Sequence, residues 1–210
     1  MIAKGRKRSW HRGLDRDAVI AEALRILDAG GRDSLTMRAL ATALEVEAAS
    51  LYAHVESKDE LVDAVLDSVL ESVIVPEPDD DVRASLVAGF ASYRRTLLGH
   101  PAVVLLMTER AQQSRTQLGL AERSIVLLEG AGLSTRQAVD AHVTLIAYVL
   151  GFILQEVSRP ALPPAGTWEP TPVLRRALTT LGERPVDDRF AVGLDLILDG
   201  VGLPRTSNAE

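Results

Sequence analysis

The sequence predicts an all-α fold, and three observations support this prediction. Ala, Leu, Glu and Arg dominate, whereas strong β-strand signals are sparse. Apolar residues recur at intervals of three or four along most of the chain. Capping boxes, Ser-x-x-Glu at Ser57 and Ser-x-x-Gln at Ser134, precede two apolar stripes. With 47% hydrophobic and 25% charged residues, the 210-residue chain can bury a sizeable core.

Three short helices are predicted after a basic segment at residues 1–13. The first spans 15–29, because Asp15 is a suitable N-cap and Gly30-Gly31 ends the apolar periodicity. The second spans 36–44 and the third 48–54. Their apolar residues can form one small core: Leu40, Leu44, Val46, Leu51 and Val55.

A fourth helix begins after the capping box of Ser57 and Glu60, and its apolar stripe runs from Leu61 to Val73. Pro76, Pro78 and the aspartates at 79–81 mark a break. The remaining periodic segments predict helices at 81–98, 100–107, 112–129, 135–157, 172–181 and 187–201. The segment 159–172 is rich in proline and is predicted to be a loop that includes Trp168.

Charge is unevenly distributed along the chain, although the formal net charge is −6. Residues 1–58 hold 10 Lys and Arg against 8 Asp and Glu, a net of +2, and the rest holds 13 against 21, a net of −8. Only the N-terminal part is therefore suited to face phosphates. Five of its positive charges form a basic arm: Lys4, Arg6, Lys7, Arg8 and Arg12.

Several classes of site find no support in the sequence. The absence of cysteine excludes disulfides, Cys-ligated metals and cysteine nucleophiles. The histidines at 11, 54, 100 and 142 form no close pair, and hydrolase, P-loop and dinucleotide motifs are absent. We therefore expect no catalytic residues, no metal site and no cofactor.

The longest apolar run, residues 143–154, bears on the compartment. It has 12 residues, whereas a membrane-spanning helix needs about 20. We predict a buried or interface helix in a cytoplasmic protein that has no membrane partner.

Residues 35–61 read as a helix-turn-helix followed by the start of a longer helix. A helix held by its neighbours, with a polar edge facing outward, is suited to reading DNA. The motif Thr36-Met37-Arg38-Ala39-Leu40-Ala41, Leu44-x-Val46, Ser50-Leu51-Tyr52-x-His54-Val55 and Lys58-x-Glu60-Leu61 resembles the TetR family of bacterial transcriptional repressors. The segments 93–98 and 150–151 are similar to the tetracycline-repressor branch of that family.

The resemblance implies a homodimer, with a basic arm and helix-turn-helix DNA-binding domain at 1–57 and a helical effector-binding and dimerisation domain at 58–210. Tyr52 and His54 can hydrogen-bond phosphates, and Ala48 and Ala49 can contact thymine methyl groups. The basic arm can add phosphate or minor-groove contacts. Carried over by position, the implied DNA contacts are Met37, Arg38, Glu47, Ala48, Ala49, Ser50, Tyr52, His54 and Lys58.

The sequence departs from the family pattern in two places. Glu45 stands in the turn where the family usually has glycine; a left-handed conformation there would cost on the order of 1 kcal/mol.

The tetracycline branch binds a drug–magnesium complex through histidines and polar residues, whereas this chain has Val73 or Ile74, Gly89 and Met107 at the aligned positions. We therefore expect a largely apolar pocket, and an uncharged or weakly polar organic effector. Its expected lining is Phe90, Tyr93, Leu97, Met107, Val139, His142, Val143 and Ile146, with Trp168 from the loop.

These observations predict a ligand-responsive repressor that binds a palindromic double-stranded operator as a homodimer. The helices at 135–157 and 187–201 of both subunits would form a four-helix bundle. An effector would shift the fourth helix and change the spacing of two recognition helices, about 34–36 Å apart on one DNA turn. The alternative is a dimeric small-molecule-binding or partner-binding module whose DNA binding is constitutive or lost.

Overall fold

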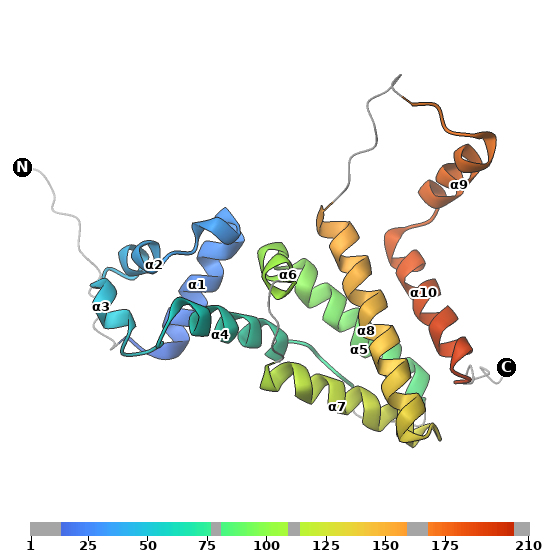
Figure 1. The fold of residues 1–210 in the computed structure, drawn as a ribbon, viewed down its shortest axis with the longest axis horizontal. Helices are drawn as coiled ribbons and strands as arrows, with labels where there is room; N and C mark the ends of the chain where they lie inside the picture. The colour runs from blue at the N-terminus through green and yellow to red at the C-terminus, as the bar shows by residue number, and fades with distance from the viewer. Residues whose placement is uncertain (1–13, 77–80, 109–113, 159–167, 204–210) are drawn as a thin grey trace, which may run out of the picture. The chain divides into compact units, whose positions relative to one another are not determined.

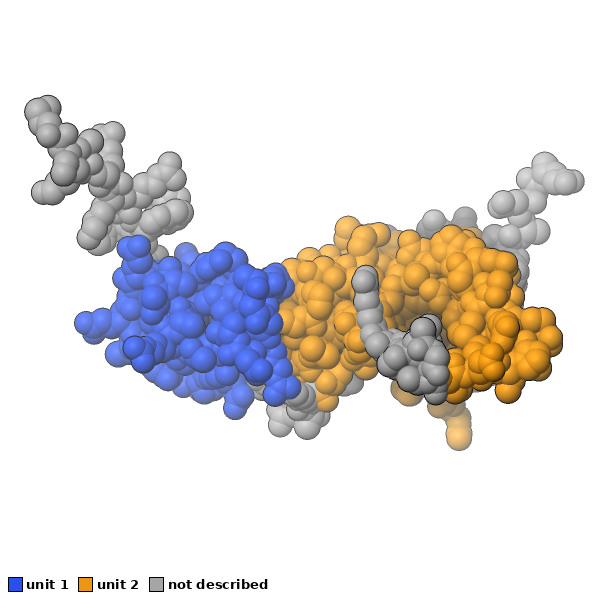
Figure 2. Space-filling model, turned by 90° about the horizontal axis from the view of Figure 1, so that it is seen from above, with its two compact units in different colours: residues 1–68 blue, residues 69–210 orange. Residues whose placement is uncertain are grey.

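The structure is a computed structural model that describes residues 14–76, 81–108, 114–158 and 168–203. Within these residues it is helical with no strand, which confirms the all-α prediction (Figure 1). The chain divides into two compact units, residues 1–68 and 69–210 (Figure 2). We expected the division at 57/58, the start of the fourth helix, but it falls inside that helix, because Leu61, Val62 and Val65 are buried in the first unit.

The described part of the first unit contains α1 (Arg16–Gly30), a short 3₁₀ turn (Arg32–Ser34), α2 (Met37–Ala43), α3 (Ala48–Leu51) and the first part of α4 (Lys58–Glu71). The predicted cap of α1 is confirmed, because Asp15 accepts from the Ala18 N–H at 2.7 Å. Thr36 caps α2 by accepting from the Ala39 N–H at 3.0 Å. Of the predicted small core, Leu40, Leu51 and Val55 are fully buried, whereas Leu44 and Val46 are half-buried.

The start of α4 differs in detail from the predicted capping box. The Ser57 hydroxyl accepts from the Glu60 N–H at 3.1 Å, as expected. The Glu60 carboxylate instead accepts from the Glu56 N–H and pairs with Arg16 of α1 at 2.8 Å. The backbone hydrogen bond, followed by the arginine, lowers the pKa of Glu60. The box therefore also ties α4 to α1.

The second unit contains the end of α4, α5 (Val82–Leu98), α6 (Pro101–Met107), α7 (Arg115–Gly130), α8 (Thr135–Ser158), α9 (Pro172–Glu183) and α10 (Val186–Gly200). Helix α8 is central and packs against α5, α6, α7 and α10. The predicted box of Ser134 and Gln137 opens α8, and Thr171 caps α9. A further box, Ser114 with Gln117, opens α7.

Helices α8 and α10 approach closely at Gly193. The Tyr148 hydroxyl donates to the Phe190 carbonyl at 3.0 Å, and its oxygen would lie 2.0 Å from a Cβ at Gly193. Any side chain at this position would therefore displace the tyrosine. Phe152 and Phe190 complete the aromatic cluster, with ring centroids 5.3 Å apart.

Helix α8 is longer than the apolar run suggested. It has 24 residues, and an 18-residue window has a mean hydropathy of 1.6, so length and composition alone would allow it to cross a membrane. Only 28% of that window is buried within the chain. Much of its apolar surface is therefore left without a partner in the single chain.

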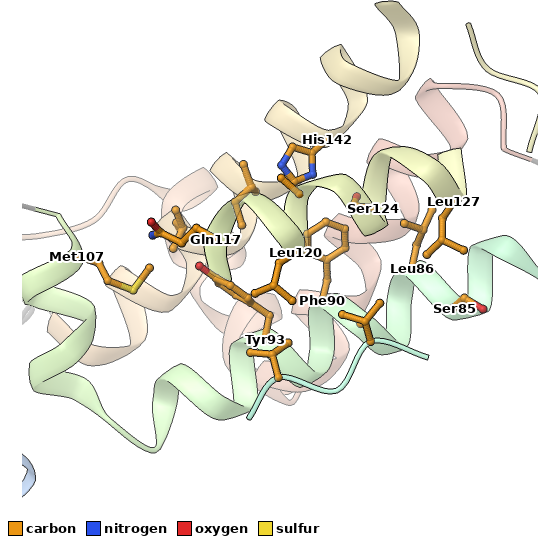
Figure 3. A pocket seen from close by; sticks show the side chains of 16 residues that line it. Ser85, Leu86, Phe90, Tyr93, Met107, Gln117, Leu120, Ser124, Leu127 and His142 are labelled. Carbon is orange, nitrogen blue, oxygen red and sulfur yellow. The ribbon is translucent and has the colours of Figure 1, made fainter. Parts of the chain in front are cut away.

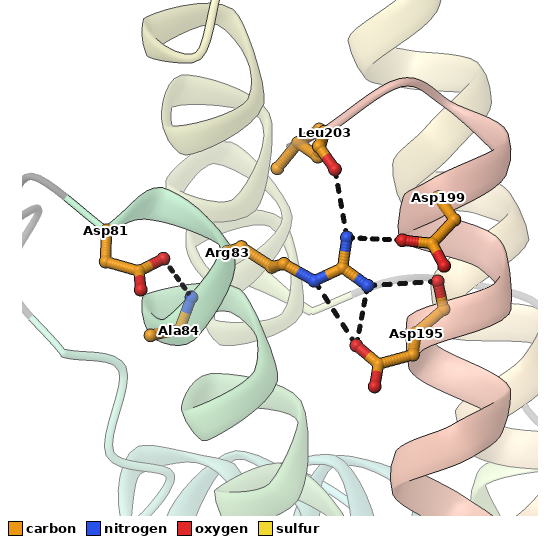
Figure 4. Close-up of polar contacts among 6 residues, drawn as sticks. All are labelled: Asp81, Arg83, Ala84, Asp195, Asp199 and Leu203. Atoms are coloured by element: carbon orange, nitrogen blue, oxygen red, sulfur yellow. Dashed lines mark hydrogen bonds and ion pairs between the residues drawn. The ribbon is translucent and has the colours of Figure 1, made fainter. Parts of the chain in front are cut away.

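Two arginines of α5 hold α10 in place. Arg83, 7% exposed, pairs with Asp195 at 2.6 Å and Asp199 at 2.8 Å, and donates to the Leu203 carbonyl at 2.9 Å (Figure 4). Arg94 pairs with Asp187 of α10 at 2.8 Å and with Glu156 of α8 at 2.7 Å. The hydrogen bonds that Arg94 donates to Glu156 are the main reason that the pKa of Arg94 is raised.

The turn between α2 and α3 holds Glu45 at φ 56°, in the left-handed region. A Cβ in this region costs on the order of 1 kcal/mol, which glycine avoids. We therefore expect Glu45→Gly to raise the free energy of unfolding by about 0.5–1 kcal/mol, measured by urea denaturation. Glu45→Ala keeps the Cβ and serves as the control. An equal gain in both variants would show that charge, rather than backbone conformation, is responsible.

The Arg83 cluster predicts a large loss of stability. Arg83→Met fills similar space but leaves the Leu203 carbonyl and two partly exposed carboxylates without their donor. We expect it to lower the free energy of unfolding by about 2–4 kcal/mol, measured from the melting of the helical circular dichroism signal. Arg176→Met, at an exposed position on α9, is the matched control and should change it by less than about 0.5 kcal/mol. Equal melting temperatures for Arg83→Met and Arg176→Met would contradict this prediction.

Candidate DNA-binding surface and effector cavity

The nine predicted DNA contacts all lie outside the core of the first unit. Met37 and His54 are half-buried, and the other seven are exposed: Arg38, Glu47, Ala48, Ala49, Ser50, Tyr52 and Lys58. Leu51 is fully buried between exposed Ser50 and Tyr52. This buried residue fixes α3 to the unit and leaves its neighbours outward, as a helix that reads the major groove requires.

Helix α3 is shorter than predicted. It ends at Leu51 rather than at His54, because the His54 and Val55 N–H groups both donate to the Leu51 carbonyl and close the chain into a turn. Tyr52 and His54 therefore leave from this turn, whereas Lys58 is the first residue of α4. In general, the N–H groups at a helix start favour an anion such as a phosphate. The arm residues Lys4, Arg6, Lys7, Arg8 and Arg12 lie outside the described residues.

The second unit contains a cavity of about 180 Å³ between α5, α7 and α8 (Figure 3). Among the residues that the structure describes, its lining includes no Asp, Glu, Lys or Arg. Five of the predicted lining residues border it: Phe90, Tyr93, Met107, His142 and Ile146.

Three predicted lining residues do not border the cavity. Leu97 is fully buried in the core, one helical turn beyond Tyr93. Val139 and Val143 lie on the exposed face of α8. The face of α8 that borders the cavity carries His142 and Ile146 instead. Trp168 is also exposed and does not line the cavity.

The sequence reasoning missed the contribution of α7 entirely. This helix lines the cavity with a stripe at helical spacing: Gln117, Leu120, Ala121, Ser124 and Leu127. This spacing of three or four residues could have predicted that they share one face of the helix. The other residues not predicted are Val73, Val75, Ser85, Leu86, Gly89 and Leu150.

Burial sets the protonation of the titratable groups in the cavity. It raises the pKa of the Tyr93 hydroxyl to about 12 and lowers the pKa of the His142 imidazole. Both side chains are therefore uncharged near neutral pH. The Ser124 hydroxyl oxygen and His142 Nδ1 are buried and have no hydrogen-bond partner among the described residues.

The positions aligned with the magnesium-drug site of the tetracycline branch offer no metal ligands. Val73, Gly89 and Met107 line the cavity, whereas Ile74 is exposed. Within the described ranges, no three His, Cys, Asp or Glu side chains are grouped to hold a metal ion. Asp79 and Asp80 lie outside those ranges, and Asp81 caps α5 by accepting from the Ala84 N–H at 2.8 Å.

A second, more open cavity of about 570 Å³ lies beside the first. The two share Val73, Val75, Leu120 and Leu127. The second cavity is also bordered by Glu71, Glu122 and Arg123, so it is the more polar of the two. Val73 and Val75 follow directly after the end of α4 at Glu71.

Comparison with known proteins gives concordant results for both halves of the chain. Residues 19–65 match the family described as bacterial regulatory proteins, tetR family, and residues 75–203 match the tetracyclin repressor-like C-terminal domain. The tetracycline repressor protein class A from transposon 1721 of Escherichia coli is 32% identical over 200 residues, covering 91% of this chain and 92% of the relative.

Two groups of solved structures are also similar. The Streptomyces coelicolor TetR family protein ActR, in complex with actinorhodin, has a TM-score of 0.75 at 32% identity and covers 90% of this chain and 97% of its own. BioQ with its double-stranded DNA operator has a TM-score of 0.69 at 29% identity, covering 90% of this chain and 98% of its own. The chain therefore belongs to the TetR family, whose members are ligand-responsive, dimeric, DNA-binding transcriptional repressors.

Proposed function

We propose that this repressor reads its operator through the nine residues of the α2–α3 surface and the start of α4, and that an uncharged organic effector occupies the cavity between α5, α7 and α8. The observation that carries the proposal is the cavity itself, whose lining among the described residues contains no Asp, Glu, Lys or Arg. A charged ligand would lose its hydration there without gaining an ion pair. The function requires no catalytic step, and we expect it to operate in the cytoplasm.

The exposed apolar faces of α8 and α10 support the predicted four-helix bundle. Val139 and Val143 on α8, and Val192 and Leu196 on α10, are separated by one helical turn in each helix. Val143 is 56% exposed and Leu196 is 68% exposed. A second copy of the chain that covers these faces would bury apolar surface that the single chain leaves open.

The coupling between effector and DNA is proposed to run through α4. Val73 and Val75 line the effector cavity, and α4 continues from them into the DNA-binding unit. An effector that prefers one placement of this segment would shift the population of α4 orientations. The shift can be no larger than the difference in effector affinity between the two states.

The DNA-binding surface is tested by two matched arginine substitutions. Arg38 is exposed on α2, and Arg25 is exposed on α1, where it pairs with Glu22 at 2.5 Å. Because we propose that Arg38 contacts a phosphate, we expect Arg38→Ala to weaken binding to the upstream DNA of the gene about tenfold and to lower the salt-dependence slope by about one. Arg25→Ala should leave both within about twofold. Fluorescence anisotropy at several salt concentrations gives both values, and equal effects would contradict the proposed surface.

The effector cavity is tested by filling it. Ala121 lines the cavity, whereas Leu118 on the same helix is exposed and borders neither cavity. Compounds from an uncharged aromatic panel that release DNA from the wild type should fail with Ala121→Phe, since the added ring occupies the cavity, and should still act on Leu118→Phe. We expect Ala121→Phe to lower the effector potency at least about tenfold, measured by DNA release. Unchanged release by Ala121→Phe would place the effector elsewhere.

A further inference from the structure

The cavity carries two polar atoms that no described residue satisfies. Ser124 on α7 is 8% exposed, and its hydroxyl oxygen has no hydrogen-bond partner among the described residues. His142 Nδ1 on α8 is likewise buried without a partner. Both side chains line the same cavity, and Figure 3 shows that they come from different helices. Native proteins rarely leave such atoms unpaired, so each one requires an explanation.

Gln117 is the other polar residue of α7 in the cavity lining, and its side chain already makes a hydrogen bond within the protein. The Gln117 amide oxygen accepts from the Ser114 N–H at 2.8 Å as part of the box that opens α7. It therefore supports the helix start rather than a ligand. Ser124 and His142 have no comparable structural task, because neither caps a helix or connects two elements.

We propose that Ser124 and His142 form the polar anchor of the effector cavity and select an uncharged aromatic effector that carries a hydroxyl group. This inference rests on the proposed effector function of the cavity. A hydroxyl both donates and accepts, as do a serine hydroxyl and a neutral imidazole through its two nitrogens. The lowered pKa of His142 keeps the imidazole neutral, so it can accept a hydrogen bond at neutral pH.

The rest of the lining supports an aromatic body for the effector. Phe90 and Tyr93 on α5 offer ring faces or edges, and Met107 offers a polarizable thioether. A cavity of about 150 Å³ holds benzene, so this cavity of about 180 Å³ admits a compact aromatic compound. Both unpaired atoms are buried but belong to side chains that line the cavity, so the proposed anchor requires each side chain to turn toward the ligand.

The test uses two probes of nearly equal shape, 1-naphthol and 1-methylnaphthalene. In a cavity without polar partners, 1-naphthol binds more weakly, because its hydroxyl gives up hydrogen bonds to water. We expect the full-length wild type to bind 1-naphthol about five- to tenfold more tightly than 1-methylnaphthalene, measured by calorimetric titration. Ser124→Ala and His142→Leu should each remove most of this preference and leave the affinity for 1-methylnaphthalene within about twofold.

Two controls separate an anchor from a structural role. Tyr93→Phe removes the hydroxyl of an aromatic residue in the lining and should keep the preference for 1-naphthol. The ligand-free Ser124→Ala protein should melt at the same temperature as the wild type or higher, because it loses an unpaired polar group. A lower melting temperature together with an unchanged preference would assign Ser124 a structural role and overturn the proposal.

The remaining outcomes distinguish this inference from the proposed function. If the wild type binds both probes but does not prefer 1-naphthol, the cavity binds ligands and the anchor is wrong. If Tyr93→Phe alone removes the preference, the anchor is Tyr93 and the proposal fails. If neither probe binds, both the anchor and the effector cavity are refuted.

Discussion

Helix α5 is the element on which the second unit depends, because it binds α10 at both of its ends. Arg83 and Arg94 are 11 residues apart, about three helical turns, so they leave α5 on the same side. Arg83 pairs with Asp195 and Asp199 of α10, and Arg94 pairs with its Asp187. Between the arginines, a neighbouring face of α5 lines the cavity with Leu86, Gly89, Phe90 and Tyr93. A change in α5 on the cavity side therefore acts on α10 through directional contacts.

Polar contacts fix the position of α10 against α5 more specifically than apolar packing would. A buried arginine must have its donors satisfied, and Arg83 achieves this with two carboxylates and the carbonyls of Asp195 and Leu203. Such a set has one favourable register, whereas apolar side chains tolerate sliding by a fraction of a turn. Arg83 also places positive charge near the C-terminal end of α10, where the helix dipole favours it. Helix α10 is thus fixed in rotation as well as in position.

The sequence predicted the features that depend on local chemistry. Helix starts at Asp15, Thr36, Ser134 and Thr171 follow from side chains that satisfy nearby N–H groups, and the all-α fold follows from periodicity. The sequence did not predict the features that depend on contacts between side chains far apart in the chain. Arg83 and Asp195 are 112 residues apart, and no periodicity pairs them. The cavity residues on α8 were half right, because periodicity identifies an apolar stripe but not which of two adjacent stripes faces inward.

That ambiguity on α8 is itself informative about function. His142 and Ile146 face the cavity, while Val139 and Val143 face outward as part of the proposed dimer surface. One helix therefore contributes both to the wall of the proposed effector site and to the proposed subunit contact, so in this proposal the two surfaces are coupled. Val73 and Val75 border both cavities, as Leu120 and Leu127 of α7 do, and they follow α4 in the chain. An effector that acts on DNA binding must then work mainly by where it holds this segment, because α5 and α8 are held by α10.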